Sequence, residues 1–285
     1  MPSMLSGREV SFFSQFGFVV LPGWFSRAEI DTIVEEGLRE IDRIYHDRDG
    51  GPQGKWAPLA GHNSPFHTSL LGPDHFLPIA EQLMGKDIYG MMSDMLMWEG
   101  NTGWHRDQDV PCDPGVKFLH YPGEKLTAET GAVSFLPGTH LDEEFRRQIP
   151  EELEEVIVSA DDFQPDKFAA TREMLENRMP VEDWCLVVET SPGDVLPFTT
   201  PLYHASFNGA SGRMICATMY SLKPTTAEGL EARRQEARII SENHLKMFNY
   251  PLERPFHSNE WVAEIQNDPV CSHWIDSLRK TNWLR

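Results

Sequence analysis

The pattern of apolar and polar positions divides the 285-residue chain into three parts. Apolar residues recur at helical spacing over residues 7–84 and again over residues 225–285. Between these parts, from about residue 86 to residue 222, short apolar runs are bounded by glycine and proline, which is typical of strands joined by turns. The pattern predicts one domain over residues 1–285, with a mainly β core and helices packed on its outside.

The N-terminal part contains three predicted helices and one buried strand. Helices are predicted over residues 7–15 and 74–84, and a strand over residues 18–21. Another helix begins after Ser26, because Glu29, three residues on, completes a capping box with it. The apolar face of this helix consists of Ile30, Ile33, Val34, Leu38, Ile41 and Ile44.

Residues 47–64 follow neither a helical nor a strand period. A segment of this length without secondary structure of its own is often a lid or a binding loop, although a merely flexible loop explains it equally well. It contains Trp56, His62 and Asn63, and Phe66 follows it. We name these four residues as candidate contacts for a substrate.

The central part contains a series of short strand candidates. The first, over residues 88–98, is apolar and rich in methionine. An acidic, helix-leaning stretch over residues 142–180 interrupts the series, and we interpret it as an insertion at the mouth of the fold. Many short strands with frequent turns predict a double-sheet jelly roll, the double-stranded β-helix of cupin-like proteins. The other candidates are residues 116–121, 131–136, 185–188, 193–196, 203–207 and 214–220.

The composition narrows the function classes. The net charge of −19 argues against nucleic acid as a partner, because phosphate binding needs clustered Lys and Arg. No apolar stretch has the length that crosses a membrane, and the first residues lack the basic and apolar regions of a secretory signal. No CxxC pair occurs, so a zinc knuckle is not expected. These features favour a protein of the reducing cytoplasm.

Two His-x-Asp motifs are the first candidates for chemistry, and their contexts separate them. His105 and Asp107 follow a predicted strand, and on an extended strand residues two apart point to the same side. This pair can therefore reach one metal ion. His140 follows a Pro-Gly turn and opens the acidic stretch, where Asp142 is better explained as a helix N-cap or a solvated charge.

His204 is the natural third ligand, since two imidazoles and one carboxylate leave positions open on a metal. An isolated His is usually a hydrogen-bonded core or surface residue, but two later residues favour the site. Ser206 shares the face of His204, and Arg213 begins the next strand. An inward-facing Arg needs an anionic partner such as a bound carboxylate, although an internal ion pair with one of the 44 acidic residues would also satisfy it.

With these pieces the chain resembles the phytanoyl-CoA dioxygenase family of iron(II)- and 2-oxoglutarate-dependent oxygenases. The order and spacing of the motifs agree with the family over roughly residues 12–222. The matching pieces are Phe16-Gly17-Phe18-Val19-Val20 before the capped helix, Trp104-His105-Arg106-Asp107, the run from Gly131 to His140, Pro192-Gly193-Asp194, and His204-Ala205-Ser206 with Arg213.

The resemblance implies a ligand set and a co-substrate site. It implies that His105, Asp107 and His204 bind iron(II), while 2-oxoglutarate and O2 occupy the remaining positions. It also implies that Arg213 anchors the distal carboxylate of 2-oxoglutarate, assisted by Ser206.

Three further residues take roles from the resemblance. Lys117 and Ser134, on neighbouring predicted strands, are additional candidates to face the co-substrate. His140 marks the fold in this family and is not expected to bind metal.

The expected activity is oxidation of a small-molecule metabolite, most simply hydroxylation, with succinate and CO2 as co-products. Desaturation, epoxidation and cyclisation start from the same chemistry. An acyl-CoA hydroxylase is an alternative within the family, but the acidic stretch over residues 142–166 offers few basic residues for a CoA thioester. A zinc hydrolase or other cupin-like metalloenzyme and a non-catalytic binding protein are the alternatives outside it. Arg213 argues against the hydrolase, and the intact ligand set argues against the binding protein.

Overall fold

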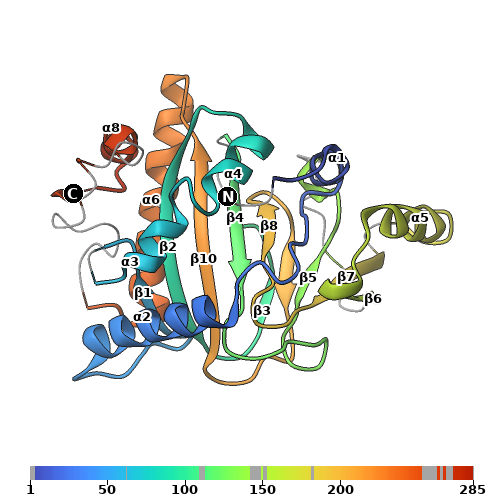
Figure 1. Cartoon of the computed structure of the whole chain (residues 1–285), viewed down its shortest axis with the longest axis horizontal. Helices are drawn as coiled ribbons and strands as arrows, with labels where there is room; N and C mark the ends of the chain where they lie inside the picture. The colour runs from blue at the N-terminus through green and yellow to red at the C-terminus, as the bar shows by residue number, and fades with distance from the viewer. Residues whose placement is uncertain are drawn as a thin grey trace.

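Two five-stranded sheets form the body of the protein, as the computed structural model shows for residues 4–61, 63–108, 113–141, 149, 153–180, 183–251, 262–263, 266–267 and 272–284 (Figure 1). The sheets are not closed into a barrel. Sheet 1 has the order β1 (Gly54–Pro58), β2 (Ile88–Trp98), β10 (Arg213–Leu222), β4 (Gly115–His120) and β8 (Leu196–Thr199). Sheet 2 has the order β3 (Thr102–His105), β9 (His204–Ser206), β5 (Val133–Phe135), β7 (Trp184–Glu189) and β6 (Glu154–Ser159).

Helices cover the outside of the sheets, as predicted. In Figure 1, α2, α6 and α8 lie on the side of sheet 1, and α1 and α5 lie at the opposite end of the molecule. The mainly β core with flanking helices is therefore confirmed. The helices are α1 (Gly7–Phe16), α2 (Arg27–Tyr45), α3 (Pro65–Leu70), α4 (Leu77–Met84), α5 (Pro165–Glu176), α6 (Ala227–Phe248) and α8 (Ser272–Lys280), with short 3-10 turns η1 (Thr139–Leu141) and η2 (Ala160–Asp162).

The start of α2 forms as the local sequence predicts. Glu29 accepts a hydrogen bond from the backbone N–H of Ser26 at 2.7 Å, and the Ser26 hydroxyl accepts one from the backbone N–H of Glu29. This reciprocal capping box satisfies two backbone donors that a helix N-terminus otherwise leaves unpaired. The signal is local, so it needs no tertiary contact to be recognised.

Three segments differ from the prediction. Residues 54–58, expected within a loop, form β1 at the edge of sheet 1, and residues 18–21 make only isolated bridges to the edge of β8. Residues 154–159, expected to lean toward helix, form β6, which runs parallel to β7. The reason is that the alternating residues Val156 and Val158 pack against the core beside sheet 2, despite the acidic residues around them.

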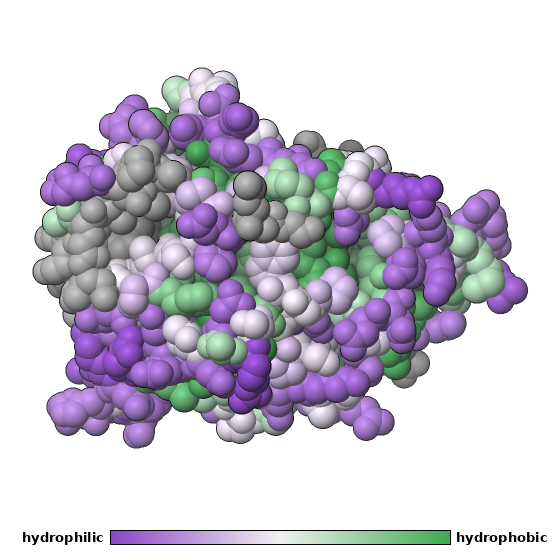
Figure 2. Space-filling model, viewed as in Figure 1, coloured by the Kyte–Doolittle hydropathy of each residue, from purple (hydrophilic) through white to green (hydrophobic). Residues whose placement is uncertain are grey.

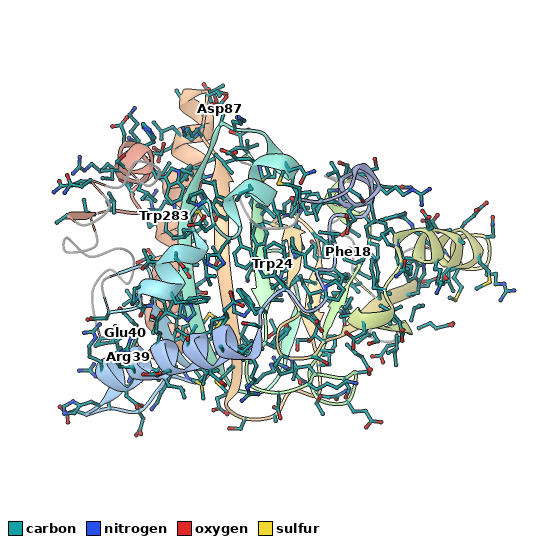
Figure 3. The ribbon with its side chains drawn as sticks, in the orientation of Figure 1. Phe18, Trp24, Arg39, Glu40, Asp87 and Trp283 are labelled. Carbon is teal, nitrogen blue, oxygen red and sulfur yellow. The ribbon has the colours of Figure 1, made fainter. Side chains whose placement is uncertain are left out.

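The core divides into two clusters of buried side chains. One lies between sheet 1 and the helices α2, α3, α4 and α8, and the other lies between sheet 2 and the helices α1 and α5. Aromatic rings dominate the second cluster: the Phe135 ring stacks on Phe18 at 4.9 Å and lies 5.4 Å from Phe198. Phe18 lies on the side of the molecule that α1 and α5 cover (Figure 3). The Phe198 ring in turn contacts His204 at 4.7 Å, so this cluster supports the candidate site from behind.

The face of the molecule shown in Figure 2 is mostly polar. On the face shown in Figure 2, hydrophilic residues predominate along α2 and at α5, and apolar residues appear mainly between the elements. Among the described residues, no helix combines the length and the apolar character that a membrane crossing requires.

Replacing Phe135 by Ala should destabilise the protein by about 3–5 kcal/mol, because it leaves a cavity inside the stacked rings. The free energy of unfolding in urea measures this loss. Phe207→Ala is the control, since Phe207 is only half-buried and should cost clearly less. Equal losses in the two variants would contradict the assigned role of the aromatic cluster.

Candidate metal centre and its cavity

A cavity of about 380 Å³ is lined by residues of both sheets and of α6. On β2 its wall is made by alternate residues, Met92, Asp94, Leu96 and Trp98, because successive side chains of a strand point to opposite faces. Alternate residues of β10 continue the wall, and sheet 2 supplies the polar side. The volume falls in the range of roughly 300–1,000 Å³ that ligand pockets typically have.

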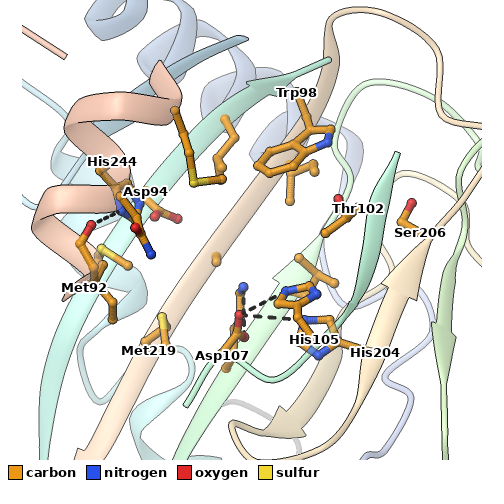
Figure 4. A pocket seen from close by; sticks show the side chains of 18 of the residues that line it. Met92, Asp94, Trp98, Thr102, His105, Asp107, His204, Ser206, Met219 and His244 are labelled. Atoms are coloured by element: carbon orange, nitrogen blue, oxygen red, sulfur yellow. Dashed lines mark hydrogen bonds and ion pairs between the residues drawn. The ribbon is translucent and has the colours of Figure 1, made fainter. Parts of the chain in front are cut away.

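Three of the predicted residues meet at the sheet 2 side of this cavity (Figure 4). β3 and β9 pair antiparallel with His105 directly opposite His204, so the two imidazole rings lie 4.2 Å apart. Asp107 follows the end of β3, and its Oδ1 lies 3.7 Å from Nε2 of each His. We call His105, Asp107 and His204 the metal triad.

Backbone carbonyls fix the orientation of both imidazoles. Nδ1 of His105 lies 2.8 Å from the carbonyl oxygen of Gly103, and Nδ1 of His204 lies 3.0 Å from that of Leu202. A carbonyl oxygen can only accept, so each Nδ1 carries the proton and donates it. In its neutral form each imidazole presents the lone pair of Nε2 toward Asp107, which is the arrangement that metal-binding imidazoles need. Burial acts to lower the pKa of His105, but Asp107 outweighs it and raises that pKa overall.

The charges of the triad suit a cation. Burial would raise the pKa of Asp107, but Lys117, whose Nζ lies 3.1 Å from Oδ2, and the two imidazoles hold that pKa well below its usual range. Burial lowers the pKa of His204 to about 3, and the neighbouring His105 lowers it further in the same direction. The site therefore offers an ionised carboxylate and a neutral imidazole as ligands.

The triad fits a metal ion. One possible ligand atom from each residue lies within 4.8 Å of the others. The Nε2–Oδ1 separation of 3.7 Å is too long for a hydrogen bond, yet it suits atoms that share one ion at about 2.0–2.2 Å. Two imidazoles and a carboxylate on one side leave the cavity side open, which is the pattern of non-haem iron oxygenases.

Arg213 lines the same cavity and has hydrogen-bond donors that no described residue occupies. Its Nη1 donates to the carbonyl of Gly131 at 3.0 Å, and the hydroxyl of Ser206 donates to the same carbonyl at 2.8 Å. Nε and Nη2 of Arg213 are buried without a hydrogen-bond partner, and no ion pair to Arg213 occurs among the described residues. The internal ion pair considered from the sequence is therefore not seen in this part of the chain, and the guanidinium can accept an anionic ligand.

Two further candidates have different positions. Lys117 lines the cavity, where its ammonium faces Asp107. Ser134 is buried in β5 and is not part of the cavity wall. His140, expected to mark the fold, lies in η1, and its Nε2 contacts the carbonyl of Ser14 at 3.3 Å, away from the triad. Asp142 lies outside the described residues.

The loop candidates for substrate contact do not reach the cavity wall. Trp56 is fully buried in β1, and its Nε1 donates to Asp94 on the neighbouring strand β2 at 2.8 Å. Asn63 and Phe66 lie outside the wall as well, and the carbonyl of Asn63 accepts a hydrogen bond from Arg39. His62 is outside the described residues. Trp56 lies on the cavity face of sheet 1, since its antiparallel partner Leu96 lines the cavity, but the His244 ring packs 4.5 Å from it. Substrate contact by Trp56 and Asn63 stays a prediction.

The sequence did not identify two parts of the wall. Asp94 lies on β2 and faces the cavity opposite the triad, and α6 closes that side with His244 and its neighbours (Figure 4). For Asp94, the sequence did contain a signal: a single Asp at an inward position of an otherwise apolar predicted strand. The apolar face of α6 gave no signal that it would cover a cavity instead of a sheet.

Comparison with known proteins supports this description. The sequence profile of the phytanoyl-CoA dioxygenase (PhyH) family matches residues 13–215. No curated protein sequence matches the chain.

Solved structures with the same fold include enzymes with iron or 2-oxoglutarate in their crystals. The carbocyclase SnoK from nogalamycin biosynthesis is 20% identical with a TM-score of 0.55, covering 80% of this chain and 91% of its own. The epimerase SnoN, in complex with Fe3+, alpha ketoglutarate and nogalamycin RO, is 16% identical with a TM-score of 0.54, covering 76% and 83%. HygX from Streptomyces hygroscopicus, with nickel, 2-oxoglutarate and hygromycin B bound, is 19% identical with a TM-score of 0.51, covering 79% and 93%. These likenesses establish the predicted cupin-type fold.

A metal titration tests the triad. The wild-type protein should bind one iron(II) per chain under nitrogen, and His204→Ala should weaken that binding by more than the roughly 10–100-fold that loss of a residue supporting a ligand costs. His140→Ala is the matched control, because His140 lies away from the triad and should leave iron binding intact. Iron content after gel filtration measures both, and equal iron binding by the His204 variant and the wild type would contradict the assignment.

Proposed function

The chain belongs to the phytanoyl-CoA dioxygenase family of non-haem iron, 2-oxoglutarate-dependent oxygenases, and from this premise we propose that it hydroxylates a small-molecule metabolite. Succinate and CO2 are the proposed co-products. The observation that carries the proposal is the combination, in one cavity, of the metal triad with the unpaired donors of Arg213.

The proposed roles follow from the contacts. His105, Asp107 and His204 hold iron(II), with the two carbonyl-bound Nδ1 atoms keeping each Nε2 turned to the ion. Arg213 donates from Nε and Nη2 to the distal carboxylate of 2-oxoglutarate. Ser206 assists by holding the Gly131 carbonyl that orients Arg213, since both donate to that oxygen.

The reaction balances without further cofactors. When bound, iron(II) and 2-oxoglutarate supply the activation of O2: one oxygen atom enters the succinate formed with CO2, and the other enters a C–H bond of the substrate. The chain itself places the co-substrate with Arg213, and Lys117 keeps Asp107 ionised. The apolar walls exclude water from the reacting atoms.

A small metabolite is favoured over an acyl-CoA. A CoA thioester carries phosphates, which need clustered Lys and Arg. Of the basic residues that line the cavity, Lys117 faces Asp107, Arg213 is assigned to the co-substrate, and Arg106 lies over the Tyr203 ring. The neighbours with nogalamycin RO and hygromycin B bound support a small-molecule substrate in a cavity of this kind.

Succinate release tests the proposed function. The protein, supplied with iron(II), ascorbate and 2-oxoglutarate, should release succinate, and pools of candidate metabolites that contain a substrate should raise the rate above the uncoupled background. Asp107→Ala should abolish this release because it removes a ligand of the ion. Asp87→Ala, at an exposed position before β2, should behave as the wild type. Normal turnover by the Asp107 variant, or no iron-dependent succinate from the wild type, would refute the proposal.

The position of Gly131 gives a test of the co-substrate site. Its φ of 100° disfavours any side chain, and a Cβ there would lie 1.8 Å from Nη1 of Arg213. Gly131→Ala should therefore displace the guanidinium and raise the half-saturating 2-oxoglutarate concentration by roughly 10–100-fold, the range for a lost charged hydrogen bond. Gly7→Ala, where a Cβ meets nothing within 4 Å, should leave that concentration unchanged. An unchanged 2-oxoglutarate requirement in Gly131→Ala would remove Arg213 as the anchor.

A further inference from the structure

The cavity wall opposite the metal triad combines apolar side chains with one buried carboxylate. Met92 and Met219 lie on this side of the cavity, and Asp94 stands among them next to His244 of α6 (Figure 4). α6 begins at Ala227 and so lies beyond the residues 13–215 that match the family. The wall therefore combines Met92 and Asp94, which lie within the segment that matches the family, with a helix that lies outside it.

One oxygen of Asp94 has a partner and the other does not. Oδ2 accepts the hydrogen bond from Nε1 of Trp56 at 2.8 Å, whereas Oδ1 is buried and has no hydrogen-bond partner among the described residues. Lys117, a cation of the cavity wall, forms its ion pair with Asp107, with Nζ 3.1 Å from Oδ2, and none with Asp94 among the described residues. Asp94 is only 3% exposed, so bulk water does not solvate it.

Burying a carboxylate oxygen without a hydrogen-bond donor is energetically unfavourable. A buried acceptor without a donor destabilises the protein, and a charged one does so more strongly. Burial accordingly raises the pKa of Asp94 to about 6, although the hydrogen bond from Trp56 acts in the opposite direction. The charge of Lys117 and the backbone of Ala217, directly opposite Asp94 on β10, also act to lower this pKa, but neither outweighs the burial.

The anionic co-substrate is not the group that fills this position. A carboxylate of 2-oxoglutarate would be repelled by Asp94, and Arg213 already offers it two free donors on the other side of the cavity. His244 next to Asp94 brings no positive charge to it. Burial lowers the pKa of His244 to about 4, and a contact with the carbonyl of Ile240 only partly opposes this. The missing partner is a hydrogen-bond donor on the substrate.

We propose that Asp94 recognises the substrate by accepting, at Oδ1, a hydrogen bond from a hydroxyl or amino group of a small and otherwise apolar molecule that lies between α6 and the metal triad. The proposal rests on the proposed function and names the substrate class of the same site. Trp56 acts as a positioning residue, since it holds the other oxygen of Asp94 from the adjacent strand β1.

Asp94→Asn tests this with little change of shape. The amide oxygen can still accept from Trp56, while the NH2 group replaces the free acceptor by a donor. The protein loaded with iron(II) and 2-oxoglutarate is kept under nitrogen, and the dissociation constants of cyclohexanol, cyclohexylamine and methylcyclohexane are measured by ligand-observed NMR. Asp87→Asn, at the exposed residue before β2 (Figure 3), is the matched control.

Asp94→Asn should raise the dissociation constant of cyclohexanol or cyclohexylamine about tenfold or more and leave that of methylcyclohexane nearly unchanged. Asp87→Asn should alter none of the three dissociation constants. The probe that responds identifies the group as hydroxyl or amine. Trp56→Phe keeps the carboxylate and should weaken the polar probes less.

Three results would overturn the proposal. The first is that Asp94→Asn leaves the binding of both polar probes unchanged. The second is that it weakens the binding of all three probes equally. The third is that Trp56→Phe weakens polar-probe binding as much as Asp94→Asn does, which would assign the effect to packing. Failure of the proposed function is read separately, as the absence of iron-dependent succinate from the wild-type protein.

Discussion

The pairing of β3 with β9, which places His105 directly opposite His204, is the constraint on which the site depends. A shift of one residue would turn one imidazole to the other face of the sheet, because side chains alternate along a strand. The register is supported from the far side, where β9 pairs with β5 and Phe135 lies opposite His204. The aromatic cluster behind these strands thus positions the ligands as well as stabilising the fold.

The second requirement of the site is that its buried charged side chains stay free to bind a metal ion and an anionic co-substrate. Arg213 and Asp107 are both held without the full set of partners that buried charges usually need. The Gly131 carbonyl fixes the guanidinium through one nitrogen only, and Lys117 balances the carboxylate without filling the space between the imidazoles. A cation among the triad and an anion at the guanidinium would lower this cost, because each buried charge would then gain a partner.

The cavity joins two parts with different constraints. The sheet 2 side carries the triad within residues that match the family, while α6 closes the opposite side from outside the matched segment. The chemistry that iron and 2-oxoglutarate provide needs a fixed geometry, whereas the substrate can vary. A helix added after the last strand of sheet 1 is a simple way for one fold to change its substrate without disturbing the triad.

The sequence by itself determined what depends on local pattern. The capping box of Ser26 and Glu29, the run of short strands, and the choice of His105-Arg106-Asp107 over His140 all follow from spacing and neighbours. The resemblance to a family supplied the roles of His204 and Arg213. These features survive because helix caps, turns and strand periods are properties of a few consecutive residues.

Only the tertiary structure decided the rest. Residues 154–159 became a strand because β7 offered a partner, and Trp56 became a buried hydrogen-bond donor to Asp94 because β1 pairs with β2. Whether Arg213 and Asp94 have partners depends on which side chains the fold brings near them, and those residues are far apart in the chain. Burial and partner identity are non-local, so the sequence pattern could name the three residues of the metal triad but not the wall that faces them.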